Sequence, residues 1–181
     1  RSGDAGRVRV YGEAPAAMPV CVVVQHMVAS QASGVLFTAN PAGALTETVI
    51  AAAYGLGEGV VQDRVETDTY ILDRATGGLR IQTSHKTARI CHDEAAGSGV
   101  CRKPVERDYA DAPVLTEAEA RSLAAIGADI GRLYPKSFLD IEWCLDGRRH
   151  MRILQCRPVT SIPSGEFTVI DNSNIVEGYP G

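Results

Sequence analysis

Residues 138–160 read FLDIEWCLDGRRHMRILQCRPVT, and this pattern predicts a β-hairpin. Apolar residues occupy every second position of the first arm, where one face consists of Leu139, Ile141, Trp143 and Leu145. Asp146-Gly147 is a strong turn signal, and Pro158 ends the pairing because proline has no N–H group to donate. The return arm alternates less cleanly; its expected faces are Arg152, Leu154 and Cys156 on one side and Met151, Ile153, Gln155 and Arg157 on the other.

The polar residues of this hairpin could carry chemistry. Asp140 and Glu142 are two residues apart, so both carboxylates project to one side of the strand, and Gln155 and Arg157 do the same on the partner strand. Together the two pairs would suit a divalent cation and phosphates, because Mg²⁺ prefers carboxylate oxygens and arginine can bind phosphate with two hydrogen bonds. Taken alone, the pattern favours the plainer alternative of a solvated hairpin with a cross-strand ion pair.

Composition narrows the classes of function. With 181 residues and 45% apolar content, the chain can build one sizeable core, or one domain and a fragment. A net charge of −4 argues against a nucleic-acid binder, and no apolar run is long enough to predict a membrane span. Five cysteines without a Cys-x-x-Cys pair fit reduced thiols in the cytoplasm. The missing initiator Met and the abrupt end suggest a piece of a longer protein.

Other elements are expected ahead of the hairpin. Three strands are predicted, at residues 20–28, 34–39 and 46–54. The first is nearly all apolar, so we expect it to be buried on both faces and paired with the second. Residues 68–72 and 79–84 predict another hairpin, across Gly77-Gly78.

The remaining segments are a turn, an excursion and a helix. Gly55-Leu56-Gly57-Glu58 is weak evidence of phosphate binding and is interpreted as a structural turn, while Lys86 is interpreted as a solvated lysine. Residues 91–113 have no period and predict a surface excursion. A capping box that begins at Thr116 opens a helix to about Leu133. Its apolar stripe, expected in the core, is Leu123, Ile126, Ile130 and Leu133.

A family resemblance rests on several separated motifs. Asp-Ile-Glu-Trp at 140–143 and Leu-Gln-Cys-Arg-Pro at 154–158 closely resemble the end of the ATP-binding domain of phosphoenolpyruvate synthases and pyruvate phosphate dikinases. Residues 33–41 are similar to that family's Ser-Gly-Val-(Leu/Phe)-Phe-Thr-x-Asn-Pro, and residues 55–58 to its Gly-Leu-Gly-Glu. Rifampin phosphotransferases share the module. The resemblance makes the four polar residues of the hairpin functional candidates.

The resemblance implies a fold and a division of the chain. The fold is α+β of the α/β sandwich type, an ATP-grasp-like nucleotide-binding lobe with a mainly antiparallel sheet and few helices. Residues 1–18 would be a loop or trimmed junction, residues 19–160 the C-terminal part of the nucleotide domain, and residues 161–181 a linker and the start of a following domain.

The resemblance also implies ATP and Mg²⁺ as ligands and assigns residues to them. Gln25 and Met27 become adenine-pocket candidates, and Arg157 is expected to neutralise phosphate. Glu142, Asp140 and Gln155 are expected to hold Mg²⁺, and Glu142 and Gln155 are also expected to contact the nucleotide. Arg157 and Gln155 are the candidates for a catalytic role.

The implied function is that of a phosphotransferase fragment. In the family, the β-phosphoryl group of ATP passes to a histidine on a separate domain, giving AMP and phosphate. No residues here match the family's first lobe, and none of the four histidines lies in its phosphohistidine motif, so this chain alone is expected to show weak or no catalysis. The first lobe and a phosphohistidine domain are the implied partners. The alternatives are a rifampin phosphotransferase-like antibiotic-modifying enzyme, a non-catalytic ATP-binding module and a structural module.

Overall fold

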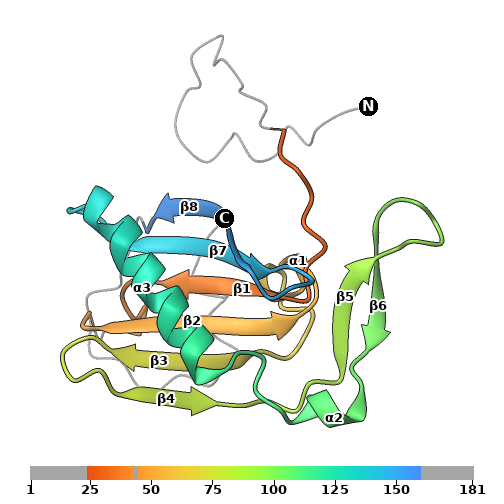
Figure 1. Cartoon of the computed structure of the whole chain (residues 1–181), viewed down its shortest axis with the longest axis horizontal. Coiled ribbons are helices and arrows are strands. Elements are labelled where there is room, and N and C mark those ends of the chain that lie inside the picture. The colour runs from red at the N-terminus through yellow and green to blue at the C-terminus, as the bar shows by residue number, and fades with distance from the viewer. Residues whose placement is uncertain (1–23, 43–44, 160–181) are drawn as a thin grey trace, which may run out of the picture.

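The computed structural model describes residues 24–42 and 45–159, and its main feature is a six-stranded antiparallel sheet (Figure 1). In spatial order the strands are β4 (Leu79–Gln82), β3 (Asp68–Asp73), β2 (Glu47–Tyr54), β1 (Ala32–Phe37), β7 (Leu139–Leu145) and β8 (Met151–Pro158). A separate two-stranded sheet consists of β5 (Ala88–His92) and β6 (Val100–Pro104). The helices are α1 (Glu58–Val61), α2 (Arg107–Ala110) and α3 (Glu117–Leu133). This arrangement confirms the predicted α+β fold.

The large sheet is covered on both faces. Helix α3 lies across one face (Figure 1), where Leu123 packs in a cluster with Ile50 and Trp143. On the opposite face, a smaller cluster joins β2 to α1 and β5 and consists of Ala51, Ala53, Val60, Val65 and Ile90. Each large aliphatic side chain buried in this way contributes about 1.5–3 kcal/mol. The two clusters therefore hold the sheet, α1 and β5 in fixed relative positions.

Several predicted elements are confirmed. The β7–β8 and β3–β4 hairpins form, and α3 begins with the expected capping box, in which Thr116 Oγ1 accepts a hydrogen bond from Glu119 N at 3.2 Å. The predicted helical stripe is right for Leu123, which is fully buried, and for Ile130, which packs against the core. It is wrong for Leu133, which is 76% exposed because residues 132–136 around the helix end all face solvent.

The predicted strand at residues 20–28 is wrong over its described part. Residues 24–28 form no strand, and Val24 and Met27 are 92% and 67% exposed. The expected pairing of this segment with β1 is also wrong, because β1 is already paired with β2 on one edge and β7 on the other. Residues 20–23 lie outside the described part of the chain.

The segment predicted as a surface excursion, residues 91–113, contains the end of β5, all of β6 and helix α2. β5 and β6 pair in antiparallel register, and Pro104 is the last residue of β6, a position that needs no N–H donor. Gly55 connects this hairpin to the end of β2. A Cβ at Gly55 would lie 2.1 Å from the carbonyl oxygen of Ile90, and its φ is +89°. Only glycine fits there, which supports the structural interpretation of the Gly-x-Gly run.

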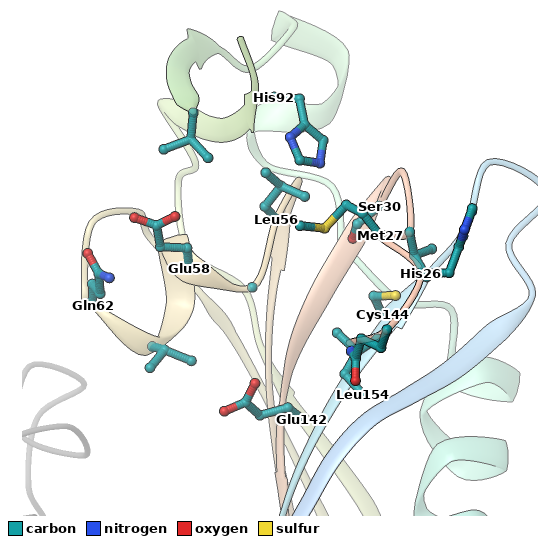
Figure 2. A pocket seen from close by; sticks show the side chains of 15 residues that line it. His26, Met27, Ser30, Leu56, Glu58, Gln62, His92, Glu142, Cys144 and Leu154 are labelled. Atoms are coloured by element: carbon teal, nitrogen blue, oxygen red, sulfur yellow. The ribbon is translucent and has the colours of Figure 1, made fainter. Parts of the chain in front are cut away.

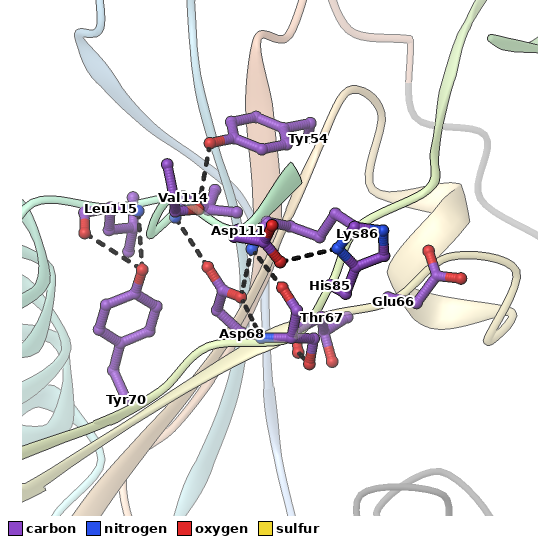
Figure 3. Close-up of polar contacts among 12 residues, drawn as sticks. Tyr54, Glu66, Thr67, Asp68, Tyr70, His85, Lys86, Asp111, Val114 and Leu115 are labelled. Atoms are coloured by element: carbon purple, nitrogen blue, oxygen red, sulfur yellow. Dashed lines mark hydrogen bonds and ion pairs between the residues drawn. The ribbon is translucent and has the colours of Figure 1, made fainter. Parts of the chain in front are cut away.

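Lys86 was interpreted as solvated, and this is wrong. Its side chain is 1% exposed, and Nζ donates to Asp68 Oδ1 at 2.7 Å and to the carbonyl of Ser84 at 2.8 Å (Figure 3). Asp68 also accepts hydrogen bonds from the backbone N–H groups of Ser84 and Val114. The local sequence gives no sign of this pair, because its two members are 18 residues apart and meet only when β3 forms.

Two further expectations concern the ends of the chain and membranes. The junction predicted at residues 1–18 and the linker predicted at residues 161–181 lie outside the described residues. Among the helices that the structure describes, none is long and apolar enough to cross a membrane.

Candidate functional site

The β7–β8 hairpin brings four predicted site residues onto one face. In the antiparallel register Asp140 lies opposite Arg157, and Glu142 lies opposite Gln155. Residues directly opposite one another in such a pair project to the same side of the sheet. The juxtaposition expected from the sequence therefore forms, on the face away from Trp143 and the core.

A β-bulge corrects the predicted faces of the return strand. The register shifts between Glu142 and Trp143, so that Gln155 pairs with Glu142 but Ile153 pairs with Trp143, leaving Leu154 as the extra residue. Met151 and Ile153 therefore lie on the core side, and Cys156 joins them there, opposite Ile141. The prediction that Met151 and Ile153 share a face with Gln155 and Arg157 is wrong, because one inserted residue exchanges the two faces beyond it.

Asp140 and Arg157 form the central ion pair of this face. Arg157 Nε donates to Asp140 Oδ2 at 2.8 Å, and Nη2 lies 2.7 Å from the same oxygen; the Arg157 side chain is 57% exposed, whereas that of Asp140 is 5% exposed. The other oxygen, Asp140 Oδ1, is buried and has no hydrogen-bond partner among the described residues. A buried carboxylate oxygen without a donor is unfavourable, so this atom is a candidate to receive a ligand.

Glu142 lies in an unusual environment for a carboxylate. It is partly buried, and its side chain makes no hydrogen bond to any residue in the described part of the chain. Burial raises the pKa of the carboxyl group above its usual range, the negative charge of Asp140 raises it further, and Arg157 opposes the shift. Glu142 and Asp140 would both be stabilised by a cation between them.

Glu142 also faces a cavity of about 410 Å³ on the α1 side of the sheet (Figure 2). Two sequence candidates, Gln25 and Met27, line the same cavity. Asp140, Gln155 and Arg157 do not line it; they continue the polar face of the hairpin beside Glu142. The six candidates thus fall into two groups. Gln25 and Met27 line the cavity, while Asp140, Gln155 and Arg157 lie on the polar face of the β7–β8 hairpin; Glu142 belongs to both groups.

The cavity walls combine an apolar surface with polar groups at the ends. The apolar side chains among its lining are Met27, Val28, Leu56, Val61, Val100 and Leu154. Figure 2 shows Glu142 and His92 at different ends, with Leu56 and Met27 between them. Glu58 also lines the cavity and pairs with Arg64 at 3.2 Å. Such a lining suits a ligand that is largely apolar and carries a few polar groups.

Sequence reasoning missed His92. It lies at the end of β5 and lines the cavity, and its Nε2 is buried without a hydrogen-bond partner among the described residues. His92 was missed because residues 91–113 were predicted to be a surface excursion, whereas its place in the cavity depends on the β5–β6 sheet. Ser30 and Cys144 were likewise not expected here, and both line the cavity.

The residues present fit Mg²⁺. No group of three or more His, Cys, Asp or Glu residues able to hold a metal exists within residues 24–42 and 45–159. Magnesium, however, is usually bound by one or two carboxylates together with substrate phosphates and water. The unpartnered Oδ1 of Asp140, the Glu142 carboxylate and the Gln155 amide oxygen form a hard oxygen donor set of that kind.

Comparison with known proteins gives a consistent set of relatives. The chain matches the family model described as pyruvate phosphate dikinase, AMP/ATP-binding domain, over residues 9–173. It is 38% identical over 152 residues to a probable phosphoenolpyruvate synthase of Methanocaldococcus jannaschii, covering 81% of this chain and 12% of the relative. The prodigiosin synthesizing transferase PigC of Serratia marcescens is 38% identical over 159 residues, with coverage of 87% and 18%. A rifampicin phosphotransferase of a Streptomyces species is 38% identical over 142 residues, with coverage of 78% and 16%. The chain spans less than a fifth of the length of each of these relatives.

Proposed function

The chain belongs to the family of pyruvate phosphate dikinase AMP/ATP-binding domains, and we propose that it supplies one side of an Mg·ATP site, with the cavity holding the nucleoside and the polar face of β7–β8 holding the phosphates. In the parent protein, the β-phosphoryl group of the nucleotide passes to a histidine on a separate domain, giving AMP and phosphate. A first lobe of the nucleotide domain completes the site.

One observation carries the proposal. Glu142 belongs both to the wall of an apolar cavity and to a face on which Asp140, Gln155 and Arg157 are adjacent. A structural hairpin has no need for a half-buried glutamate beside a buried aspartate oxygen when neither has a hydrogen-bond partner among residues 24–42 and 45–159. This arrangement supports a ligand that has a planar apolar part and a polyanionic part joined to a cation.

The residues have separate tasks. Gln25 and Met27 contact the base, while Glu142, Asp140 and Gln155 hold Mg²⁺. When bound, the ion neutralises phosphate charge and orients the phosphoryl group for transfer. Arg157 is held against Asp140 by a hydrogen bond and an ion pair, which keeps its positive charge beside the position proposed for the phosphates. This chain therefore positions the nucleotide and neutralises the charge of its phosphates, and the nucleophile comes from another domain.

The final acceptor is outside this chain. The relatives carry names that include phosphoenolpyruvate synthase and rifampicin phosphotransferase, and the chain covers only 12% and 16% of the two named above. We favour the phosphoenolpyruvate synthase-like activity, with the antibiotic-modifying activity as its alternative. A location in the cytoplasm stays a prediction; the four cysteines in the described residues are all free thiols.

Isothermal titration of Mg·ATP into the chain and into its full-length parent tests the proposal. We expect binding to the parent, and we expect Glu142→Ala and Arg157→Ala each to abolish it along with Mg·ATP turnover. Arg152→Ala is the matched control, because Arg152 is an exposed arginine on the same strand that pairs with Asp146. Binding that survives both site substitutions would overturn the assignment, and a parent that binds no Mg·ATP would favour the structural-module alternative.

A further inference from the structure

A second cavity lies on the side of β5 opposite to the nucleotide cavity. Its volume is about 380 Å³, and it is formed by the end of β2, β5, the α2 region and the turn between β7 and β8. Its polar lining residues are Gln31, Tyr54, Arg89, Glu106, Tyr109 and Arg149. Successive side chains of a strand point to opposite faces, so Arg89 and His92, three residues apart on β5, serve different cavities.

The β5–β6 sheet presents two cations, Arg89 and Lys103, to this side. Nε of Arg89 is buried and has no hydrogen-bond partner within the described part of the chain, and Lys103 lies directly opposite Arg89 in the ladder. Like charges at directly opposed positions destabilise a strand pair. Neither Arg89 nor Lys103 forms an ion pair with another residue in the described ranges. An anion between them would relieve both the repulsion and the unmet donor.

The other walls add fixed hydrogen-bond donors. Arg149 is anchored by Glu119, with Nε–Oε1 and Nη2–Oε2 distances of 2.6 and 2.7 Å, so its guanidinium is held in place at the cavity wall. Tyr54 and Tyr109 pack edge to face with ring centroids 5.9 Å apart. Burial raises the pKa of Tyr54, and its hydroxyl donates to the carbonyl oxygen of Ala112 at 3.5 Å, so the hydroxyl of Tyr109 is the one that can donate to a ligand.

We propose that this cavity binds a small oxyanion, a phosphate or carboxylate group, at a site separate from the nucleotide pocket. Arg89 donates to the anion oxygens, the Tyr109 hydroxyl adds a hydrogen bond, and Lys103 and Arg149 add positive charge. Glu106 is the only carboxylate among the lining residues in the described chain, and it makes no ion pair with Arg89 that would block the anion. The proposal does not depend on nucleotide binding.

Calorimetric titration of the chain with inorganic phosphate, and separately with malonate as a carboxylate probe, tests the site. We expect saturable binding of at least one probe, weakened at least about tenfold by Arg89→Gln, since a hydrogen bond to a charged group is lost. Lys103→Gln, an exposed substitution that should not disturb folding, is expected to weaken it in the same direction. Arg102→Gln is the matched control, because Arg102 is the neighbouring residue on β6 and projects to the opposite face.

An Arg157→Ala variant separates the two sites. Anion binding that persists in Arg157→Ala and is lost in Arg89→Gln supports the proposal. Binding that is lost in Arg157→Ala and unchanged in Arg89→Gln places the anion on the β7–β8 face and overturns it, as does the absence of saturable binding for both probes. Titration of Mg·ATP into the same variants reports on the proposed function independently.

Discussion

Two ion pairs in this molecule have the same closest approach and opposite surroundings. Lys86 Nζ lies 2.7 Å from Asp68, and Arg157 Nη2 lies 2.7 Å from Asp140. Both side chains of the first pair are sealed, at 1% and 0% exposure, whereas the Arg157 side chain is 57% exposed. Distance therefore does not distinguish them; what differs is access to solvent and the use of the remaining hydrogen-bonding atoms.

The two aspartates show that difference directly. Asp68 uses both oxygens, accepting from Lys86, from Ser84 N at 2.9 Å and from Val114 N at 2.8 Å (Figure 3). Asp140 uses one oxygen for Arg157 and leaves the other buried without a donor. A fully satisfied buried pair fixes structure, and a partly satisfied one is ready to take a ligand. The comparison thus assigns Asp68 to the fold and Asp140 to the candidate site.

Breaking the sealed pair should have the largest effect. Lys86→Met leaves Asp68 as a buried, uncompensated charge, and we expect a loss of about 3–5 kcal/mol in the free energy of unfolding. Urea denaturation followed by circular dichroism measures it. Lys136→Met, at an exposed lysine outside the strands and helices, is the matched control and should change stability little.

A second variant sharpens this test. Combining Lys86→Met with Asp68→Asn removes both charges and should recover part of the loss, because the penalty arises mainly from the unpaired carboxylate. If Lys86→Met lowered the free energy of unfolding by less than about 1 kcal/mol, solvent would reach this pair more easily than its exposed fraction indicates.

Opening the exposed pair should have a smaller effect on stability. Arg157→Gln removes a cation that is more than half exposed but leaves Asp140 Oδ2 without its donors, so we expect a loss of about 1–2 kcal/mol. The same urea denaturation measures it, side by side with Lys86→Met. A loss equal to that of Lys86→Met would remove the distinction between the two pairs.

The fold was predictable where local patterns agree with tertiary contacts. The β7–β8 hairpin combines alternation with an Asp-Gly turn, and α3 combines a capping box with an apolar stripe, so both were predicted. The described part of residues 20–28 was misassigned because an apolar run does not reveal that both edges of β1 are already occupied. The burial of Lys86 was missed because it depends on Asp68, far away in sequence.

The residues on the polar face of the β7–β8 hairpin could be predicted from the sequence, but the full lining of the cavity could not. Spacing of two residues placed Asp140 with Glu142 and Gln155 with Arg157, and the observed register joins the pairs. The bulge at Leu154 left that register intact while reversing the faces of Met151 and Ile153, which periodicity could not detect. His92 reaches the cavity only through a small sheet whose residues show no alternation, so no sequence signal identified it.

The smallest expected effect has the opposite sign and concerns Glu142. Burial and the charge of Asp140 raise its pKa above the usual 4.5, so the native state holds a proton more tightly than the unfolded chain does. The native carboxyl group therefore favours folding below about pH 4.5 and loses that contribution as the pH rises through its raised native pKa.

Glu142→Gln should raise the melting temperature at pH 7 by about 1–2 °C, and this gain should vanish at pH 4. Thermal unfolding across that range measures it, with Glu58→Gln on the other cavity wall as the control. A Glu142→Gln variant that melts lower than the parent chain at pH 7 would mean that the charged carboxylate stabilises the fold, and Glu142 would then resemble Asp68 rather than a group held ready for a cation.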